Sequence, residues 1–300
     1  MKLRILTAII VVLALASACS AKVDVVTSAP NLASLARSIG GDLVNVTSLA
    51  RPQDDLHFVE PRPSFVTKLK NADMVVIYGM SYDVWMRTLI DNSRNRKIAP
   101  GGAGYVDASV GIRKMEIPAG KIDMSMGELH PQGNPHYLLD PDNARIAAKS
   151  ILGGLIRVSP GNEDRFRAGY DLFVKRLDTA IDKWDKQMRP FKGKPVVTYH
   201  KSWIYFTSHF GLDDAGTIEP KPSIPPSPSH VSRLVSEMKK ENIKVIMLET
   251  FYPRKFPDLI ARQTGAGVVV IPHEVGEAKG TDTYISLMDH IVGAVAGGLQ

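Results

Sequence analysis

One long run with helical spacing constrains the fold of this chain most. It begins at Pro160-Gly-Asn-Glu-Asp, a helix start whose acidic residues suit the positive end of the helix dipole. Large apolar residues then recur every three or four positions until Pro190. They are Phe166, Tyr170, Phe173, Leu177, Ile181 and Trp184. The stripe predicts a helix of roughly 27 residues, about 40 Å long, which suits a connector between two lobes.

Strand-like and helix-like segments alternate on both sides of this run. In the first half, the expected strands lie at 22–28, 44–49 and 74–78, and the expected helices at 31–39, 63–71 and 85–92. In the second half, the expected strands lie at 195–200, 244–249 and 268–272, and the expected helices at 231–241, 257–264 and 283–299. This alternation predicts an α/β fold with two lobes, each a mostly parallel sheet flanked by helices. Ligands of such sheets bind beyond the carboxyl ends of the strands, which here indicates the cleft between the lobes.

The start of the chain is typical of an export signal. A cationic segment at Met1–Arg4 precedes an apolar run at Ile5–Ala16, and small residues follow up to Ala21. The apolar run is shorter than the roughly 20 residues that a membrane span needs. We therefore expect a signal peptide over 1–21 and a periplasmic or other extracytoplasmic location. Cleavage after Ala21 is favoured; cleavage before Cys19, which would leave a lipid anchor, is the alternative.

Composition narrows the chemistry that remains. Cys19 is the only cysteine, so a chain cut after Ala21 has neither a disulfide nor a thiolate metal ligand. Lysine and arginine number 37 against 31 aspartates and glutamates, a mild and evenly spread excess that does not indicate nucleic-acid binding. Beyond the signal we expect an N-terminal lobe over 22–159, the linking helix over 160–190 and a C-terminal lobe over 191–300.

The candidate ligands lie where predicted strands end. The eight histidines form no His-Glu-x-x-His pair, and the nucleotide-binding and serine-hydrolase motifs are absent. His57 follows the second expected strand, and His136 lies in a segment punctuated by Pro135 and Pro141. His200 ends the strand that starts at Pro195, and Asp282 precedes the last helix. If they converge, three imidazoles and one carboxylate would suit tetrahedral zinc.

These segments resemble the metal-binding solute-binding proteins of zinc and manganese ABC importers, the cluster A-I (cluster 9) family. The resembling stretches are Gln53–Ser64, Gly133–Pro141, Thr198–Phe206 and Gly280–Tyr284, and the likeness covers nearly the whole chain after the signal. The resemblance implies two ligands per lobe: His57 and His136 from the first, His200 and Asp282 from the second. It also implies a monomeric receptor, not an enzyme, whose partner is an ABC permease in the membrane.

Three departures from the family pattern bear on the site. Asp55-Leu56 stands where the family usually has an acid-proline pair before the first histidine. The region 114–132 is short and carries only His130, with Asp123 and Glu128, where zinc-specific members often have a long histidine-rich loop. His130 is thus an accessory candidate. Manganese-preferring members commonly have glutamate at the position of His200, so histidine favours Zn(II) as the transported ion, with Mn(II) as the alternative.

Two further hypotheses concern acidic residues near the expected site. Glu249 ends a central strand, where it would serve as an acceptor that holds a histidine tautomer or as a fifth ligand. A secreted zinc hydrolase is the competing function, because a catalytic zinc has three protein ligands, an open water position and a base, here Glu249 or Glu60. Coordination by Asp282 would argue against it. The long linking helix also predicts that the lobes move little against each other.

Overall fold

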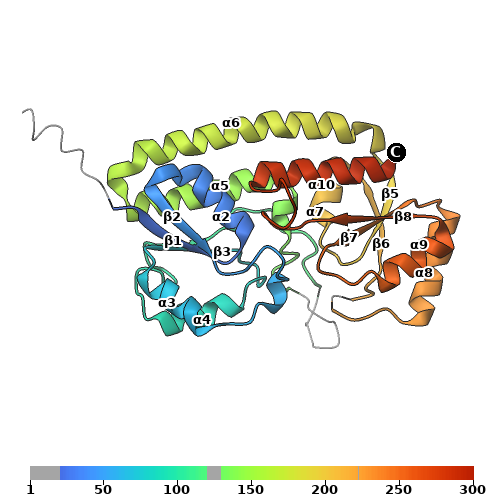
Figure 1. Cartoon of the computed structure of the whole chain (residues 1–300), viewed down its shortest axis with the longest axis horizontal. Coiled ribbons are helices and arrows are strands. Elements are labelled where there is room, and N and C mark those ends of the chain that lie inside the picture. The colour runs from blue at the N-terminus through green and yellow to red at the C-terminus, as the bar shows by residue number, and fades with distance from the viewer. Residues whose placement is uncertain (1–20, 120–129, 222) are drawn as a thin grey trace, which may run out of the picture.

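The computed structural model describes residues 21–119, 130–221 and 223–300. It contains two four-stranded sheets of order β2-β1-β3-β4 and β6-β5-β7-β8, and every strand pair in them is parallel (Figure 1). Helices flank both sheets, which confirms the predicted α/β fold with two lobes. Most of the predicted signal, including Cys19, lies outside the described residues, as do Asp123 and Glu128.

The two lobes have closely similar element orders. The first contains β1 (Val23–Thr27), α2 (Pro30–Gly40), β2 (Val44–Ser48), α3 (Pro63–Asn71), β3 (Met74–Ile77), α4 (Trp85–Ser93), β4 (Tyr105–Asp107) and α5 (Pro141–Val158). The second contains β5 (Pro195–Thr198), α7 (Ile204–Phe210), β6 (Asp213–Thr217), α8 (Pro228–Lys240), β7 (Val245–Glu249), α9 (Lys255–Thr264), β8 (Gly267–Ile271) and α10 (Tyr284–Leu299). Helix α6 (Glu163–Met188) joins them.

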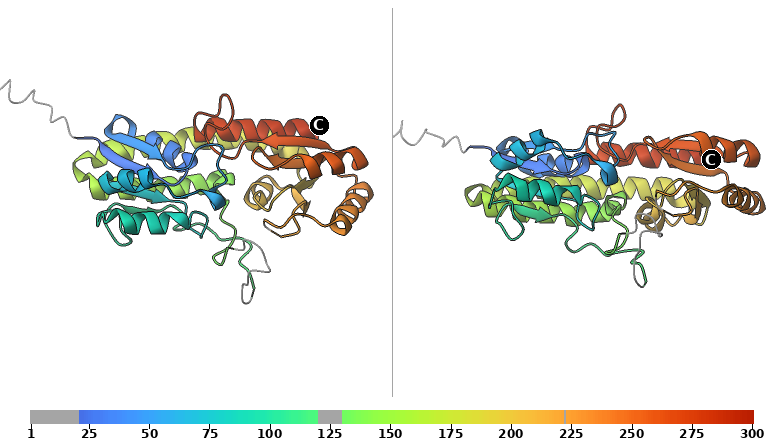
Figure 2. Two further views of the ribbon diagram at one scale, coloured as in Figure 1. Left: turned by 60° about the horizontal axis from the view of Figure 1, so that its bottom comes forward. Right: turned by 90° about the horizontal axis from the view of Figure 1, so that it is seen from below.

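Helix α6 is the predicted connector. It is 26 residues long and runs beside both lobes in each view (Figures 1 and 2). Its predicted apolar stripe is largely buried, with Phe166, Leu177 and Trp184 fully enclosed, and it packs against α5 and α2 of the first lobe and against α10. The Trp184 indole also donates a hydrogen bond to Asp289 Oδ1 on α10, at 2.7 Å.

Helix α10 is a second element that crosses the junction of the lobes. Besides packing on β8, its first residue reaches the first lobe: Tyr284 N donates to Ser34 Oγ at 2.9 Å, and its hydroxyl donates to the carbonyl of Leu138 at 2.6 Å. One hydrophobic cluster accordingly contains residues of both sheets, such as Val25 and Val196. A shared core opposes wide separation of the lobes, in keeping with the predicted small movements.

Four elements were not predicted. Strands β4 and β6 are short edge strands, and β6 has the polar sequence Asp-Asp-Ala-Gly-Thr, which lacks the apolar run of a buried strand. Helix α7 has only seven residues. For α5, Asp140-Pro141 serves as a helix start: the Asp140 side chain accepts from Asp142 N, and Pro141 occupies the first turn.

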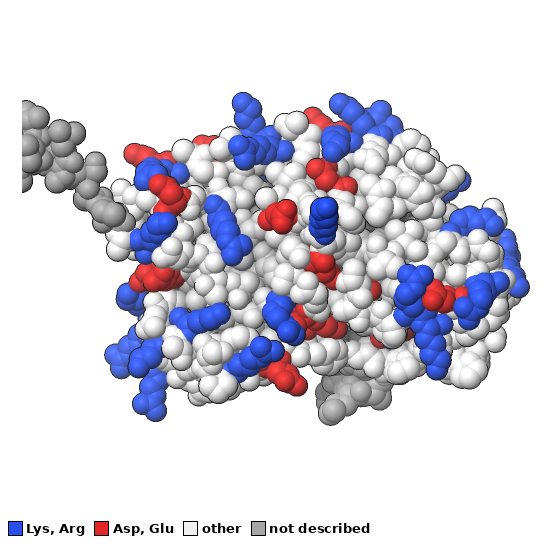
Figure 3. Space-filling model, viewed as in Figure 1, with Lys and Arg blue, Asp and Glu red and all other residues white. Residues whose placement is uncertain are grey.

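The surface shows mixed charge. On the face drawn in Figure 3, lysine and arginine side chains are scattered over both lobes, with aspartate and glutamate among them. Within the described part of the chain, no helix has the combined length and hydrophobicity needed to cross a membrane.

Candidate metal centre

Three histidines from different strand ends converge where the two lobes meet. His57 lies in a short 3-10 turn (Leu56–Phe58) after β2, His136 immediately precedes another (Tyr137–Leu139), and His200 follows β5. One ring nitrogen from each lies within 4.8 Å of the other two. The structure therefore brings together three of the four residues proposed from the sequence as ligands.

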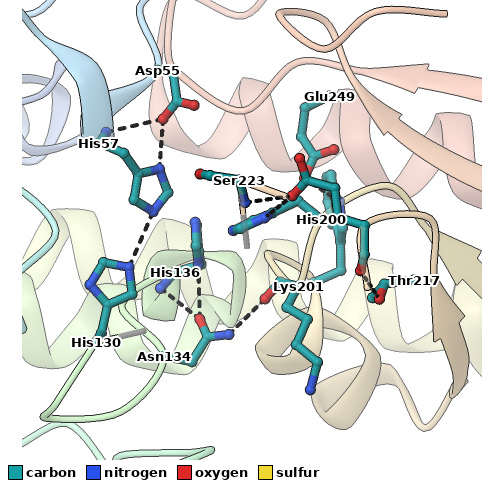
Figure 4. Close-up of polar contacts among 12 residues, drawn as sticks. Asp55, His57, His130, Asn134, His136, His200, Lys201, Thr217, Ser223 and Glu249 are labelled. Atoms are coloured by element: carbon teal, nitrogen blue, oxygen red, sulfur yellow. Dashed lines mark hydrogen bonds and ion pairs between the residues drawn. The ribbon is translucent and has the colours of Figure 1, made fainter. Parts of the chain in front are cut away.

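Each of these rings is oriented by a hydrogen bond between its Nδ1 and a side-chain oxygen. Asp55 Oδ1 lies 2.7 Å from His57 Nδ1, and Asn134 Oδ1 lies 2.9 Å from His136 Nδ1 (Figure 4). In the second lobe, Glu219 Oε2 lies 2.9 Å from His200 Nδ1. These acceptors place the hydrogen on Nδ1 and leave the Nε2 lone pair for a metal, a common outer arrangement of metal-binding histidines.

The three histidines are buried, and burial affects the pKa of groups at the site. The side chains of His57 and His200 are each 4% exposed, and His136 is 2% exposed. Burial, reinforced by the imidazoles of His200 and His57, holds the pKa of His136 well below its ordinary value. Burial acts against ionisation of Asp55 too, but the hydrogen bond and charge pairing with His57 outweigh it and lower the pKa of Asp55. At neutral pH the site thus contains a neutral imidazole, that of His136, and a charged carboxylate, that of Asp55.

A fourth histidine, His273, adjoins this group. It stands two residues after the end of β8 at Ile271, it is 2% exposed, and its ring centroid lies 5.6 Å from that of His136. Among the described residues, its buried Nε2 has no hydrogen-bond partner. Burial lowers the pKa of His273 to about 4, so this imidazole is also neutral. His273 was not among the predicted ligands, although the rule that sites form at strand carboxyl ends points to it.

Comparison with known proteins decides the family. The protein-family model described as "ZnuA: Zinc-uptake complex component A periplasmic" matches residues 25–298. The chain belongs to this ZnuA family. Relatives in this family are named as substrate-binding components of metal ABC transporters, such as ScbA of Streptococcus cristatus, and the family consists of receptors rather than enzymes.

Individual relatives of the ZnuA family are named for different metals. The iron-binding protein YfeA of Yersinia pestis is 23% identical over 92% of this chain and 86% of its own. The manganese-binding lipoprotein MntA of Halalkalibacterium halodurans is 24% identical over 92% of this chain and 88% of its own. A crystal structure of ZnuA, 23% identical, superposes with a TM-score of 0.78 and covers 93% of this chain and 100% of that one. The Mn-bound periplasmic metal binding protein of Candidatus Liberibacter asiaticus, 19% identical, gives 0.78 with the same coverage. These two structures support the fold alone.

Asp282, the fourth ligand predicted from the sequence, lies apart from the three histidines in this structure. It is exposed, and it is not part of the histidine group formed by the described residues. The reason lies in the loop after β8: its first residues face the site, whereas Asp282 comes later, just before the cap of α10 at Thr283. His273 takes the place next to the three histidines that was expected of Asp282.

Glu249 is buried near the site but does not hold a histidine ring. Its Oε1 accepts from the Trp203 indole at 3.0 Å, and burial raises the pKa of Glu249 to about 8. The acceptor role expected of it belongs to Glu219, which follows the unpredicted strand β6. Glu60, the other residue considered as a hydrolytic base, is exposed. With a family of transport receptors, the hydrolase alternative is not supported.

His130 lies close to the site from the first lobe. Its Nε2 is 3.2 Å from His57 Nε2, and the two ring centroids are 5.2 Å apart (Figure 4). Burial, together with the neighbouring imidazole of His57, lowers the pKa of His130 to about 3. The residue expected to be an accessory is therefore placed against one of the three converging histidines.

Proposed function

We propose that this chain is an extracytoplasmic receptor that binds Zn(II) between its lobes and delivers it to an ABC-type membrane importer. The observation that carries the proposal is the convergence of His57, His136 and His200, each with Nδ1 held by an oxygen. Membership of the ZnuA family supports the metal-binding transport function. Zinc is the finer part of the proposal, because relatives are named for manganese and iron as well.

The donor set favours zinc. Ligands at about 2.0–2.1 Å from a tetrahedral zinc stand about 3.3 Å from one another, and these three nitrogens already lie within 4.8 Å. His273 is the proposed fourth ligand, since its Nε2 is buried beside them without a partner among the described residues. Imidazole is a ligand that zinc accepts readily, whereas manganese prefers carboxylate oxygens. A set of four imidazoles therefore fits Zn(II) better than Mn(II).

The proposal extends to processing and delivery. Residues 1–21 would direct export, the domain boundaries are those predicted above, and the mature receptor would act as a monomer that meets its permease. Several relatives carry "lipoprotein" in their names, which supports an acylated Cys19 as the alternative to a free periplasmic form. Mass spectrometry of the mature N-terminus separates the two.

Metal analysis of natively purified protein, followed by competitive chelator titration with Zn(II) and Mn(II), tests the proposal. We expect one equivalent of bound zinc and a lower dissociation constant for Zn(II) than for Mn(II). His273→Ala should weaken zinc binding, whereas His290→Ala, which removes an exposed imidazole on α10, should not. Tighter binding of manganese by the unmutated protein would overturn the choice of metal. The absence of tight binding by either ion would overturn the function.

A further inference from the structure

The segment that carries His136 is held in place by second-lobe residues of α7 and of the turn before it. Tyr205 and His209 are spaced four residues apart on this helix and therefore lie on the same side of it. Lys201 lies in the turn that precedes the helix and directly follows His200, one of the proposed ligands.

The first of these contacts is at Asn134, two residues before His136. The Tyr205 hydroxyl donates to the Asn134 carbonyl at 3.1 Å and accepts from Met115 N at 3.1 Å. Tyr205 is 2% exposed. Its hydroxyl therefore ties two hydrogen-bonded segments of first-lobe backbone, at Met115 and Asn134, to the second lobe.

The Asn134 side chain connects one proposed ligand to the residue that follows another. Its Oδ1 accepts from the backbone N of His136 at 3.1 Å and faces His136 Nδ1 at 2.9 Å. Its Nδ2 donates to the carbonyl of Lys201 at 2.6 Å and to Glu116 Oε2 at 3.0 Å (Figure 4). Because the His136 N–H can only donate, the amide orientation is fixed. One amide thus joins the His136 ring to the backbone next to His200.

Two ion pairs lie at the two ends of this contact between the lobes. Lys201 Nζ lies 2.9 Å from Glu116 Oε1, whose residue adopts a left-handed φ of 50°. At the other end, His209 Nδ1 lies 2.8 Å from Asp140 Oδ1, the cap of α5. The segment from Asn134 to Asp140 is therefore held at both ends by residues of the second lobe.

His57 is held differently. Both side chains that its ring nitrogens contact, Asp55 at 2.7 Å and His130 at 3.2 Å, belong to its own lobe. The turn that carries it is anchored by a hydrogen bond from the Trp85 indole to the carbonyl of Leu56, at 3.0 Å, again within the first lobe. Nothing in this set of contacts ties His57 to the position of His200.

Resting on the proposed function, we propose that Lys201, Tyr205 and Asn134 are positioning residues that lock His136 to His200 across the lobes. The two ligands then move as one unit, and metal enters and leaves by displacement of His57. This arrangement explains how metal can reach a site between lobes that share a core. The short turn that carries His57 moves, and the two lobes do not separate.

The test is Zn(II) affinity of Tyr205→Phe in three backgrounds, measured by chelator competition. Loss of one net hydrogen bond should weaken zinc binding about threefold to tenfold in the otherwise unmutated protein. Tyr205→Phe should cause the same loss of zinc affinity when it is added to His57→Ala. It should cause no further loss when it is added to His200→Ala, because that variant lacks the ligand to which His136 is linked. Tyr137→Phe is the matched control: it removes a buried hydroxyl that bonds Tyr78 O within the first lobe at 2.8 Å. An equal factor in all three backgrounds would overturn the lock, while the unmutated protein still binds zinc.

Asn134→Asp provides a second test. The lock and a simple acceptor role for Asn134 predict opposite changes in zinc affinity. The aspartate keeps an acceptor for His136, and an anionic acceptor alone makes a ligating imidazole more basic and metal binding tighter. It loses the donor to the Lys201 carbonyl and faces the Glu116 carboxylate. The lock therefore predicts weaker zinc binding by about tenfold or more, partly recovered when Glu116→Gln is added. Unchanged or tighter binding by the folded variant would overturn the proposal, and thermal unfolding of the metal-free protein checks the fold.

Discussion

The two lobes deliver their histidines in different ways, although their strand orders match. In the second lobe, His200 and His273 each stand two residues after a strand end, at Thr198 and Ile271. In the first lobe, His57 and His136 lie much farther along the chain from the preceding strand ends, at Ser48 and Asp107. The second-lobe rings are therefore positioned by the sheet itself, and the first-lobe rings depend on local contacts in loops.

The acceptors on Nδ1 follow the same division. Asp55 and Asn134 each stand two residues before the histidine that they orient, so a loop supplies both ring and acceptor. Glu219 is nineteen residues from His200 and reaches it because β6 lies beside β5 in the sheet. The His57 turn, whose acceptor lies in its own lobe, can therefore move as a unit. The His200 pair is fixed by the strand order, and Asn134 is bonded to the Lys201 carbonyl of the second lobe.

The largest expected effect separates a sheet-borne ligand from a loop-borne one. Removing the hydrogen-bond partner of a metal ligand weakens metal binding by up to roughly 100-fold. His200→Ala should weaken zinc binding by more than this, since it removes the ligand itself. His57→Ala should cost less, because His130 Nε2 lies 3.2 Å from the lost nitrogen and can take its place. Chelator competition with Zn(II) measures both.

The double variant His57→Ala with His130→Ala checks this explanation. It should lose as much affinity as His200→Ala, while His130→Ala alone should change little. If His57→Ala by itself equals His200→Ala, the replacement by His130 does not occur, and the two lobes contribute ligands of equal weight.

The same division decides what could be predicted from the sequence. The connector and the sheet strands with strong apolar runs were predictable because their periodicity is local. His57, His136 and His200 were predictable as a set only through their places at strand ends and the family resemblance. Glu219 was not, because its role depends on which strand lies beside β5. The structure puts His273 beside the three histidines and leaves Asp282 exposed; both follow β8, and only the path of the loop tells them apart.

Changes of the acceptors should have the next largest effect. Glu219→Gln and Asp55→Asn keep an oxygen near each ring but remove the charge, which lowers the basicity of the imidazole. We expect each to weaken zinc binding about tenfold. Hydrogen exchange should distinguish them: with its own acceptor weakened, the turn around His57 should exchange faster in the metal-free protein, whereas the strand end at His200 should not. Equal exchange at both sites would contradict the division between loop and sheet.

Two buried carboxyls behind the site predict different pH dependences for the lobes. Burial raises the pKa of Asp83 in the first lobe from 3.8 to about 6, and that of Glu249 in the second from 4.5 to about 8. Between its unfolded and folded pKa, each group binds more protons in the folded state, so stability falls as pH rises through that window.

Of these two carboxyls, only Glu249 still loses its proton between pH 6 and 8. Over this range Glu249→Gln should gain stability relative to the unmutated metal-free protein, by up to about 5 °C in Tm. Asp83→Asn should show its relative gain below pH 6 and no further change above it. Thermal unfolding at pH 5, 6 and 8 measures both. A flat difference between Glu249→Gln and the unmutated protein across these pH values would show that Glu249 is ionised in the folded state.

The smallest expected effect concerns the residue at the far end of the loop after β8. Asp282 is exposed beside the Thr283 cap of α10, whose own hydroxyl already accepts from Ser286 N at 3.1 Å. Asp282→Asn should therefore leave zinc affinity unchanged within about twofold and alter Tm by little, as surface substitutions usually do. His273→Ala, at the other end of the same loop, should weaken zinc binding. If instead Asp282→Asn weakens binding and His273→Ala does not, the loop folds back onto the metal in the loaded protein, and the second lobe positions its last ligand by a loop, as the first lobe does.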